Sequence, residues 1–200
     1  MNKIIAAFTA ALCITFIATG YSERVQADLQ DNLIRLHIIA DSDNDADQEI
    51  KLKVRDRVLK YISEKIDTSG DDCRDEIVNN LDEIEKIADN TLEENGFQYK
   101  SHAEYGKFEF PQKSYKSMTL PAGEYYGVRI VLGGGGGHNW CCVMYPPVCI
   151  NENGEAGLGS ESEKILREKL DADTYDIVTG KNDKVVVKFK LVELIQKIIH

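Results

Sequence analysis

The stretch GEYYGVRIVLGGGGGHNWCCVMYPPVCI, residues 123–150, decides how the chain folds. Aromatic and β-branched side chains are frequent on both sides of its glycine run, which predicts strands over 123–132 and 139–145. Glycine tolerates positive φ, so Gly133–Gly137 predicts a wide, irregular turn between these strands. The two prolines that follow cannot continue a central strand, and the chain should bend there. We therefore interpret the stretch mainly as architecture, with Trp140 as a core side chain.

Patterns outside this stretch predict the other elements. A mostly apolar, β-rich run over 32–40 predicts a buried strand, which the acidic run DSDNDAD ends. The other expected elements are a helix that starts near 46 and ends before the break at 68–72, helices over 73–96, 160–170 and 191–199, and strands over 97–110 and 183–190. Because the strands cluster in the middle of the chain, we predict an α+β fold, a single domain with a mainly antiparallel sheet flanked by helices and stapled by disulfides.

The first of these helices has a defined start and one apolar face. Asp45 is the expected N-cap, with Gln48 three residues on, an arrangement typical of a capping box. The same reasoning makes Ser160 the expected cap of the helix at 160–170. Apolar residues then recur at i, i+4 spacing along the first helix, at Ile50, Val54, Val58 and Ile62.

The N-terminal 27 residues predict an export signal. One cation, Lys3, precedes an apolar run over 4–18, and Val25–Ala27 supplies small residues of the kind that signal peptidases cleave after. The run is shorter than the ~20 residues that span a bilayer, which favours cleavage over anchoring. We predict a signal peptide over 1–27, the only part of the chain expected to meet a membrane, and a single domain over 28–200.

Charge and cysteine content limit what the exported domain could be. Loss of Lys3, Glu23 and Arg24 changes the net charge from −10 to −11, since two cations and one anion leave. An acidic domain repels phosphate backbones, so nucleic acid is excluded as a partner. Four cysteines remain, at 73, 141, 142 and 149, and an even number outside the cytosol predicts disulfides, with three possible pairings.

Two metal sites suggest themselves, and the sequence favours neither. The alternating aspartates of DSDNDAD resemble a calcium loop, but such a loop needs glycine at its sixth position and glutamate at its twelfth, where Ala46 and Leu52 stand. Zinc bound by His138 and the nearby cysteines is disfavoured because Cys141 and Cys142 would point to opposite faces of a strand. We expect no metal and no cofactor.

A cysteine nucleophile is the main catalytic alternative. Cys141 or Cys142 together with His138 or His102 would form a thiolate–imidazole pair, as in a secreted hydrolase acting on cell wall or peptide. The sequence shows no third residue to orient the histidine, and an oxidising compartment disfavours a reactive thiol. We therefore predict that the protein is not an enzyme.

Two long motifs resemble the stage II sporulation protein R family of spore-forming Firmicutes. They are NLIRLHIIADSDNDADQEIKLKVRDRVL and PAGEYYGVRIVLGGGGGHNWCCVMYPPVC, and the tail VVVKFKLVELIQKI is similar too. The family typically has Trp-Trp-Cys where this chain has Trp140-Cys141-Cys142. The resemblance thus implies a disulfide between Cys142 and Cys149, and leaves Cys73 and Cys141 as a second possible pair.

The resemblance also implies a function. Proteins of this family are expected to be made in the forespore and exported into the space between the forespore and mother-cell membranes. There they activate a membrane-embedded aspartic protease, stage II sporulation protein GA, which processes the precursor of a mother-cell sigma factor. The implied role is that of a signalling protein.

We place the partner-binding surface at the end of the first strand and the start of the first helix. This stretch belongs to one of the two motifs, and its charges exceed what capping a helix requires. The predicted residues are Asp41, Ser42, Asp43, Asp47, Lys51, Lys53 and Arg55. The alternatives are that the aspartates only solvate the turn, or that the surface lies around Gly133–Trp140.

Overall fold

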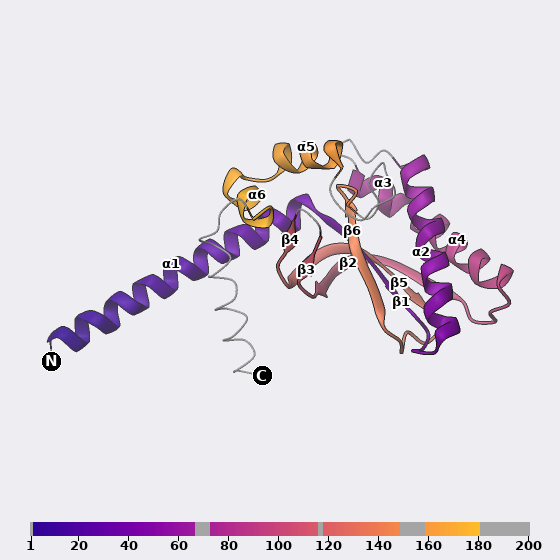
Figure 1. Ribbon diagram of the computed structural model, residues 1–200, viewed down its shortest axis with the longest axis horizontal. Helices are drawn as coiled ribbons and strands as arrows, with labels where there is room; N and C mark the ends of the chain where they lie inside the picture. The colour runs from indigo at the N-terminus through magenta and orange to yellow at the C-terminus, as the bar shows by residue number, and fades with distance from the viewer. Residues whose placement is uncertain (1, 67–72, 116–117, 149–158, 181–200) are drawn as a thin grey trace.

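The computed structural model of the protein describes residues 2–66, 73–115, 118–148 and 159–180 (Figure 1). Its helices are α1 (Asn2–Asn32), α2 (Asp45–Lys65), α3 (Cys73–Asn79), α4 (Leu81–Glu94), α5 (Ser160–Lys169) and α6 (Ala172–Val178). Its strands are β1 (Ile34–Ile39), β2 (Ser101–Phe110), β3 (Lys113–Ser114), β4 (Thr119–Leu120), β5 (Gly123–Leu132) and β6 (Asn139–Tyr145). The strand and helix predicted after residue 182 lie outside the described residues.

The main sheet has the strand order β2-β5-β1-β6 and is mixed. β2 runs antiparallel to β5 and β6 antiparallel to β1, whereas β1 and β5 are parallel, with Arg35 opposite Gly127 and Ile39 opposite Val131. The α+β class and the flanking helices are confirmed. The prediction of a mainly antiparallel sheet missed the parallel pair at its centre, which forms because β1 inserts between β5 and β6.

This insertion explains the five glycines. Since β5 and β6 are not neighbours, the connection between them must cross over the C-terminal end of β1. It therefore runs close to the backbone of the loop that follows β1. Gly133 has a φ of 56°, a conformation that favours glycine. At Gly137 a Cβ would lie 2.5 Å from the carbonyl carbon of Ser42, so that a side chain there would displace backbone. We call residues 133–138 the glycine arch.

The sheet carries a hydrophobic core on each face. On β1, Leu36 and Ile38 join the core beneath α2, α3 and α4, where the predicted stripe of α2 is fully buried. The opposite core contains β6 residues, including Cys141, and is closed by the C-terminal part of α1 together with α5 and α6. In Figure 1 α2 and α4 lie to the right of the sheet and α6 to its left, and α1 projects away from the body as a long rod.

The face opposite α2 has a charged residue at its centre. Arg35 is completely buried, and its guanidinium carbon lies 4.2 Å from the ring centroid of Phe110 and 5.0 Å from that of Tyr125. Its Nη1 donates a long hydrogen bond of 3.5 Å to the carbonyl of Pro111. Nε and Nη2 have no hydrogen-bond partner among the described residues. The two aromatic faces are therefore the main stabilising contacts of this cation in the described structure.

Three predicted helix boundaries were wrong. The N-cap of α2 is Asn44, whose side chain accepts from the backbone N–H of Asp47, one residue before the expected cap. Gly159 precedes α5, so Ser160 is already helical. The helix predicted over 73–96 is divided at Asn80, which has non-helical backbone and whose side chain accepts a hydrogen bond from Tyr61. Asparagine competes for such local polar contacts and is a poor residue for a helix interior.

The structure contradicts one of the two predicted disulfides. Cys73 and Cys141 both carry thiols, so this pair is wrong. The physical reason is the sheet itself, because Cys73 lies in the core beneath α2–α4 and Cys141 in the core on the opposite face. Cys142 is disulfide-bonded. Its predicted partner, Cys149, lies outside the described residues, so the pairing of these two residues remains a prediction.

The N-terminal helix runs without a break through the predicted cleavage site after Ala27. Val25 and Leu29, on either side of that site, are both buried in the core with α5 and α6. None of the helices in the described residues is long and apolar enough to span a membrane.

Candidate functional site

The two sequence motifs meet at the end of β1. One carboxylate oxygen of Asp41 accepts a hydrogen bond from the backbone N–H of Gly134, and the carbonyl of Asp41 accepts from Gly136. The carbonyl of Ala40 accepts from the next residue of the arch, Gly137. The loop after β1 and the glycine arch are therefore bound to each other along the backbone, as one rigid surface element.

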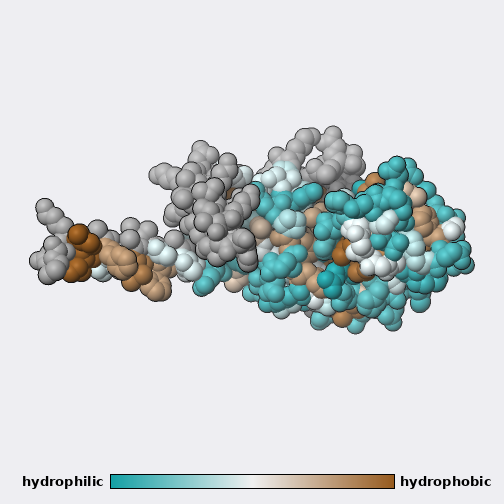
Figure 2. Space-filling view, turned by 90° about the horizontal axis from the view of Figure 1, so that it is seen from below, coloured by the Kyte–Doolittle hydropathy of each residue, from teal (hydrophilic) through white to brown (hydrophobic). Residues whose placement is uncertain are grey.

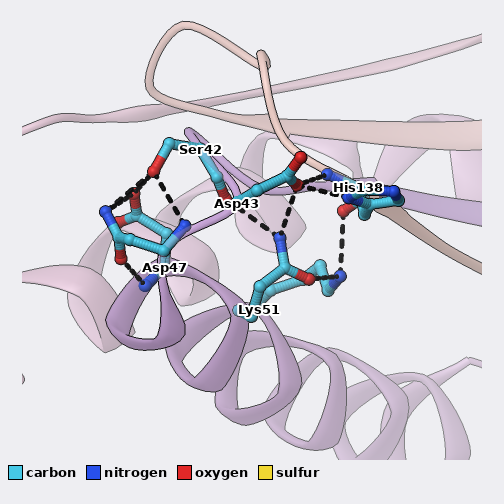
Figure 3. Close-up of polar contacts among 7 residues, drawn as sticks. Ser42, Asp43, Asp47, Lys51 and His138 are labelled. Atoms are coloured by element: carbon cyan, nitrogen blue, oxygen red, sulfur yellow. Dashed lines mark hydrogen bonds and ion pairs between the residues drawn. The ribbon is translucent and has the colours of Figure 1, made fainter.

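Asp43 and Lys51 fix the end of the arch (Figure 3). The carboxylate of Asp43 accepts from both the backbone N–H and the Nδ1 of His138, each at 2.5 Å. These contacts lower the pKa of Asp43, the backbone N–H contributing most. The Nζ of Lys51 donates to the carbonyl of His138 at 2.9 Å and to the side chain of Gln48. Burial lowers the pKa of Lys51, and the nearby Asp43 carboxylate opposes that shift.

Asp47 lies below this surface and is not part of it. Its side chain is only 4% exposed and accepts hydrogen bonds from the hydroxyls of Ser42 and Tyr99. The side-chain amide of Asn44 donates to it as well. Ser42, and then Tyr99 and Asn44, lower the pKa of Asp47. Asp47 thus holds the loop to α2 from a buried position, and the contact with a partner that we predicted for it remains a prediction.

We expect Asp47→Ala to lower the free energy of unfolding by about 2–3 kcal/mol at pH 7, because hydrogen bonds to a buried charge are lost. The pKa of Asp47 is lower in the folded than in the unfolded protein. Its contribution is therefore complete above about pH 4 and is lost as the pH falls through the folded pKa. Urea denaturation at pH 7 and pH 3 measures both effects.

The matched control for this prediction is Asp45→Ala. Asp45 lies in the same first turn of α2 but is exposed. Only its interaction with the helix dipole is lost, which costs less than about 1 kcal/mol. Equal destabilisation by the two variants would show that the hydrogen bonds of Asp47 contribute nothing.

The cations of α2 point in two directions. The guanidinium of Arg55 lies 5.1 Å from the ring centroid of Trp140, the half-buried residue just after the arch. Lys53 is turned away from the arch, because its Nζ donates to the side chain of Asn95 at the end of α4. Arg55 also pairs with Asp56, its sequence neighbour on the same helix.

These contacts define the surface that a partner could reach. We call it the arch surface: Asp43, Gly134, Gly136, His138, Asn139, and the half-buried Arg55 and Trp140. Of the seven residues predicted from the sequence, Asp43 and Arg55 belong to it, and Asp41, Ser42 and Lys51 hold it in place. The alternative prediction, Gly133–Trp140, forms the rest of the same surface.

One pattern in the sequence could have shown that Asp47 and Lys51 are buried. Asp47 and Lys51 stand at the spacing of the apolar stripe that continues through Ile50, Val54 and Val58. Residues with this spacing share one face of a helix. The spacing alone therefore places both charged side chains on the buried face of α2. We predicted that they are exposed only because they are charged.

The residues considered for a catalytic pair have other contacts in the described part of the chain. His138 is bound to Asp43, and His102 lies 3.2 Å from Glu85 of α4. Cys141 lies opposite His37 in the β1–β6 ladder, and both residues are buried. Within the part of the chain that the structure describes, no three His, Cys, Asp or Glu side chains are placed to hold a metal ion.

Comparison with known proteins identifies the family. The profile of stage II sporulation protein R matches residues 30–155, which includes both motifs that form the arch surface. The chain belongs to the stage II sporulation protein R family. It is 36% identical over 189 residues to Stage II sporulation protein R of Bacillus subtilis (strain 168), covering 87% of this chain and 84% of that protein. No solved structure matches the chain.

The region that matches the family includes the whole main sheet and the arch surface. The matched region begins just before β1 and extends beyond β6, so it contains all four strands of the main sheet. The resemblance inferred from the two motifs is confirmed, and the protein is a sporulation protein. The similarity to the B. subtilis member of the stage II sporulation protein R family covers 84% of that protein and includes regions outside the sheet.

Proposed function

We propose that this protein is an exported signal of the forespore. In this proposal it acts in the space between the forespore and mother-cell membranes and activates a membrane-embedded aspartic protease resembling stage II sporulation protein GA. The protease then processes the precursor of a mother-cell sigma factor. The membership of the chain in the stage II sporulation protein R family is the observation that carries the proposal.

The structure supports a role in binding rather than in catalysis. The arch surface combines an exposed acidic residue, Asp43, with a cation stacked on an aromatic ring, Arg55 on Trp140. Aromatic and arginine side chains are frequent where interfaces gain most of their binding energy. Hydrogen bonds from the arch to Asp41 and Asp43 fix the backbone of this surface in advance. A surface that is already ordered loses little conformational entropy when a partner binds.

The test compares two charge reversals on one helix. Arg55→Glu places an anion beside Trp140 on the arch surface, whereas Lys53→Glu places the same anion on the side of α2 that faces Asn95. We expect Arg55→Glu to reduce the amount of processed sigma factor roughly tenfold, since reversing a charge at an interface weakens both encounter and binding. Lys53→Glu should leave processing close to that of the wild type.

The measurement uses sporulating cells whose own gene has been deleted and replaced by each variant. Immunoblots follow the precursor and the processed sigma factor, and a second antibody measures the amount of exported variant. If deletion of the gene leaves processing unchanged, the proposed function is wrong. If processing requires the gene but the two variants behave alike, the proposed signalling function stands. In that case the partner does not bind at the arch surface.

A further inference from the structure

We infer that export removes residues 1–20, by cleavage after Gly20, and that the mature protein begins at Tyr21. The inference rests on the proposed export of the protein. It replaces the cleavage site after Ala27 that the sequence alone suggested. The reason is the position at which α1 changes from an isolated helix into a part of the folded domain.

The large apolar side chains that the structure describes in the first half of α1 are exposed. Ile4 is 76% exposed, Phe8 74% and Phe16 70%, although these are among the most apolar residues of the chain. Figure 2 shows this end of the rod as a hydrophobic region that stands apart from the mainly hydrophilic body. A mature protein in water would not keep such a helix exposed, whereas the apolar segment of a signal peptide is removed after use.

The helix becomes part of the domain at Tyr21. Tyr21 packs against the core formed with α5 and α6, and Val25, one turn later, is only 2% exposed within it. Arg24 forms an ion pair with Asp171 at 2.7 Å. The side chain of Gln26 donates a hydrogen bond to the carbonyl of Glu124 at 2.8 Å. Cleavage after Ala27 would remove all four residues, so the product would begin within a buried helix.

The residues around Gly20 have the pattern that cleavage requires. The apolar run is followed by Ala18-Thr19-Gly20, with small residues three positions and one position before the cut. Gly20 is exposed, and a Cβ built on it would meet no atom within 4 Å. The new N-terminus would start with Tyr21-Ser22-Glu23, which places a serine and an acidic residue where helix starts favour them. Sequence and packing thus agree on the same boundary.

The experiment determines the N-terminus of the exported protein. The full chain is expressed with a C-terminal affinity tag in a Bacillus host, and the product is collected from the medium and analysed by intact mass and N-terminal sequencing. Gly20→Gln and Ala27→Gln are matched variants, because both positions are exposed and receive the same side chain. We expect Tyr21 as the first residue of the wild type and of Ala27→Gln. Gly20→Gln should lose that product and accumulate the uncleaved precursor.

Three results would overturn the inference. They are a wild-type product that begins at Asp28, loss of cleavage in Ala27→Gln but not in Gly20→Gln, and a wild-type chain that retains Met1 in the medium or in the cells. The readout is independent of signalling. A product that begins at Tyr21 but triggers no sigma-factor processing would contradict the proposed function. It would still support cleavage after Gly20.

Discussion

Arg35→Ala is expected to lower the free energy of unfolding by about 3–5 kcal/mol, the cost of removing a large side chain from a closed core. Arg35 is fully buried between the rings of Phe110 and Tyr125, and its truncation would leave a cavity that neither ring can fill without losing its other contacts. Urea denaturation followed by circular dichroism measures the change.

The control variant, Arg35→Met, separates volume from charge. Methionine retains much of the volume of the side chain but removes a cation whose Nε and Nη2 have no hydrogen-bond partner among the described residues. We expect a cost below about 1.5 kcal/mol, since replacing buried charge by apolar volume is often nearly neutral. If methionine costs as much as alanine, the guanidinium itself, through its contacts with the two rings, is what the core requires.

Gly137→Ala is expected to lower the free energy of unfolding by about 1–3 kcal/mol and to reduce sigma-factor processing. A single methyl group there meets the backbone of Ser42, and backbone must move to accept it. The movement would separate the arch from the loop after β1 and disturb the surface that both segments form. Thermal unfolding of the purified variant and the immunoblot assay described above measure the two effects.

Gly134→Ala is the matched control in the same arch. Gly134 is exposed, and a Cβ there would lie 3.4 Å from the carboxylate of Asp41, at an ordinary contact distance. We expect a change in stability within about 0.5 kcal/mol, as is usual for surface substitutions. Equal destabilisation at both positions would mean that the arch tolerates no side chain anywhere, and that close approach at Gly137 is not the deciding feature.

Local patterns in the sequence predicted the elements well and their partners poorly. The strands at 123–132 and 139–145 and the four-residue apolar stripe of α2 were correct because periodicity reports which side of an element is buried. Periodicity does not report which strand lies alongside, so the insertion of β1 between β5 and β6 was missed. The disulfide between Cys73 and Cys141 failed for the same reason, because sequence spacing does not show that a sheet lies between two residues.

The site was predicted in two halves that looked like alternatives. Asp43 and Arg55 came from one motif and Gly133–Trp140 from the other, and only the strand order makes them one surface. The burial of Asp47 depends on the hydroxyl of Tyr99, which follows α4 and has no visible relation to Asp47 in the sequence. Residues that are joined only by tertiary contacts cannot be grouped by reading along one segment.

The strand order also determines at which stage of folding the arch surface can form. β1 is the first strand to be synthesised, yet its two neighbours in the sheet, β5 and β6, come only after three helices and three other strands. Pairings so distant in sequence close late in folding, because a long loop must first be ordered. The arch can settle over the end of β1 only when β6 has been made and docked. A truncated or partly folded chain therefore has no arch surface. Any partner that binds this surface binds only fully synthesised and folded molecules.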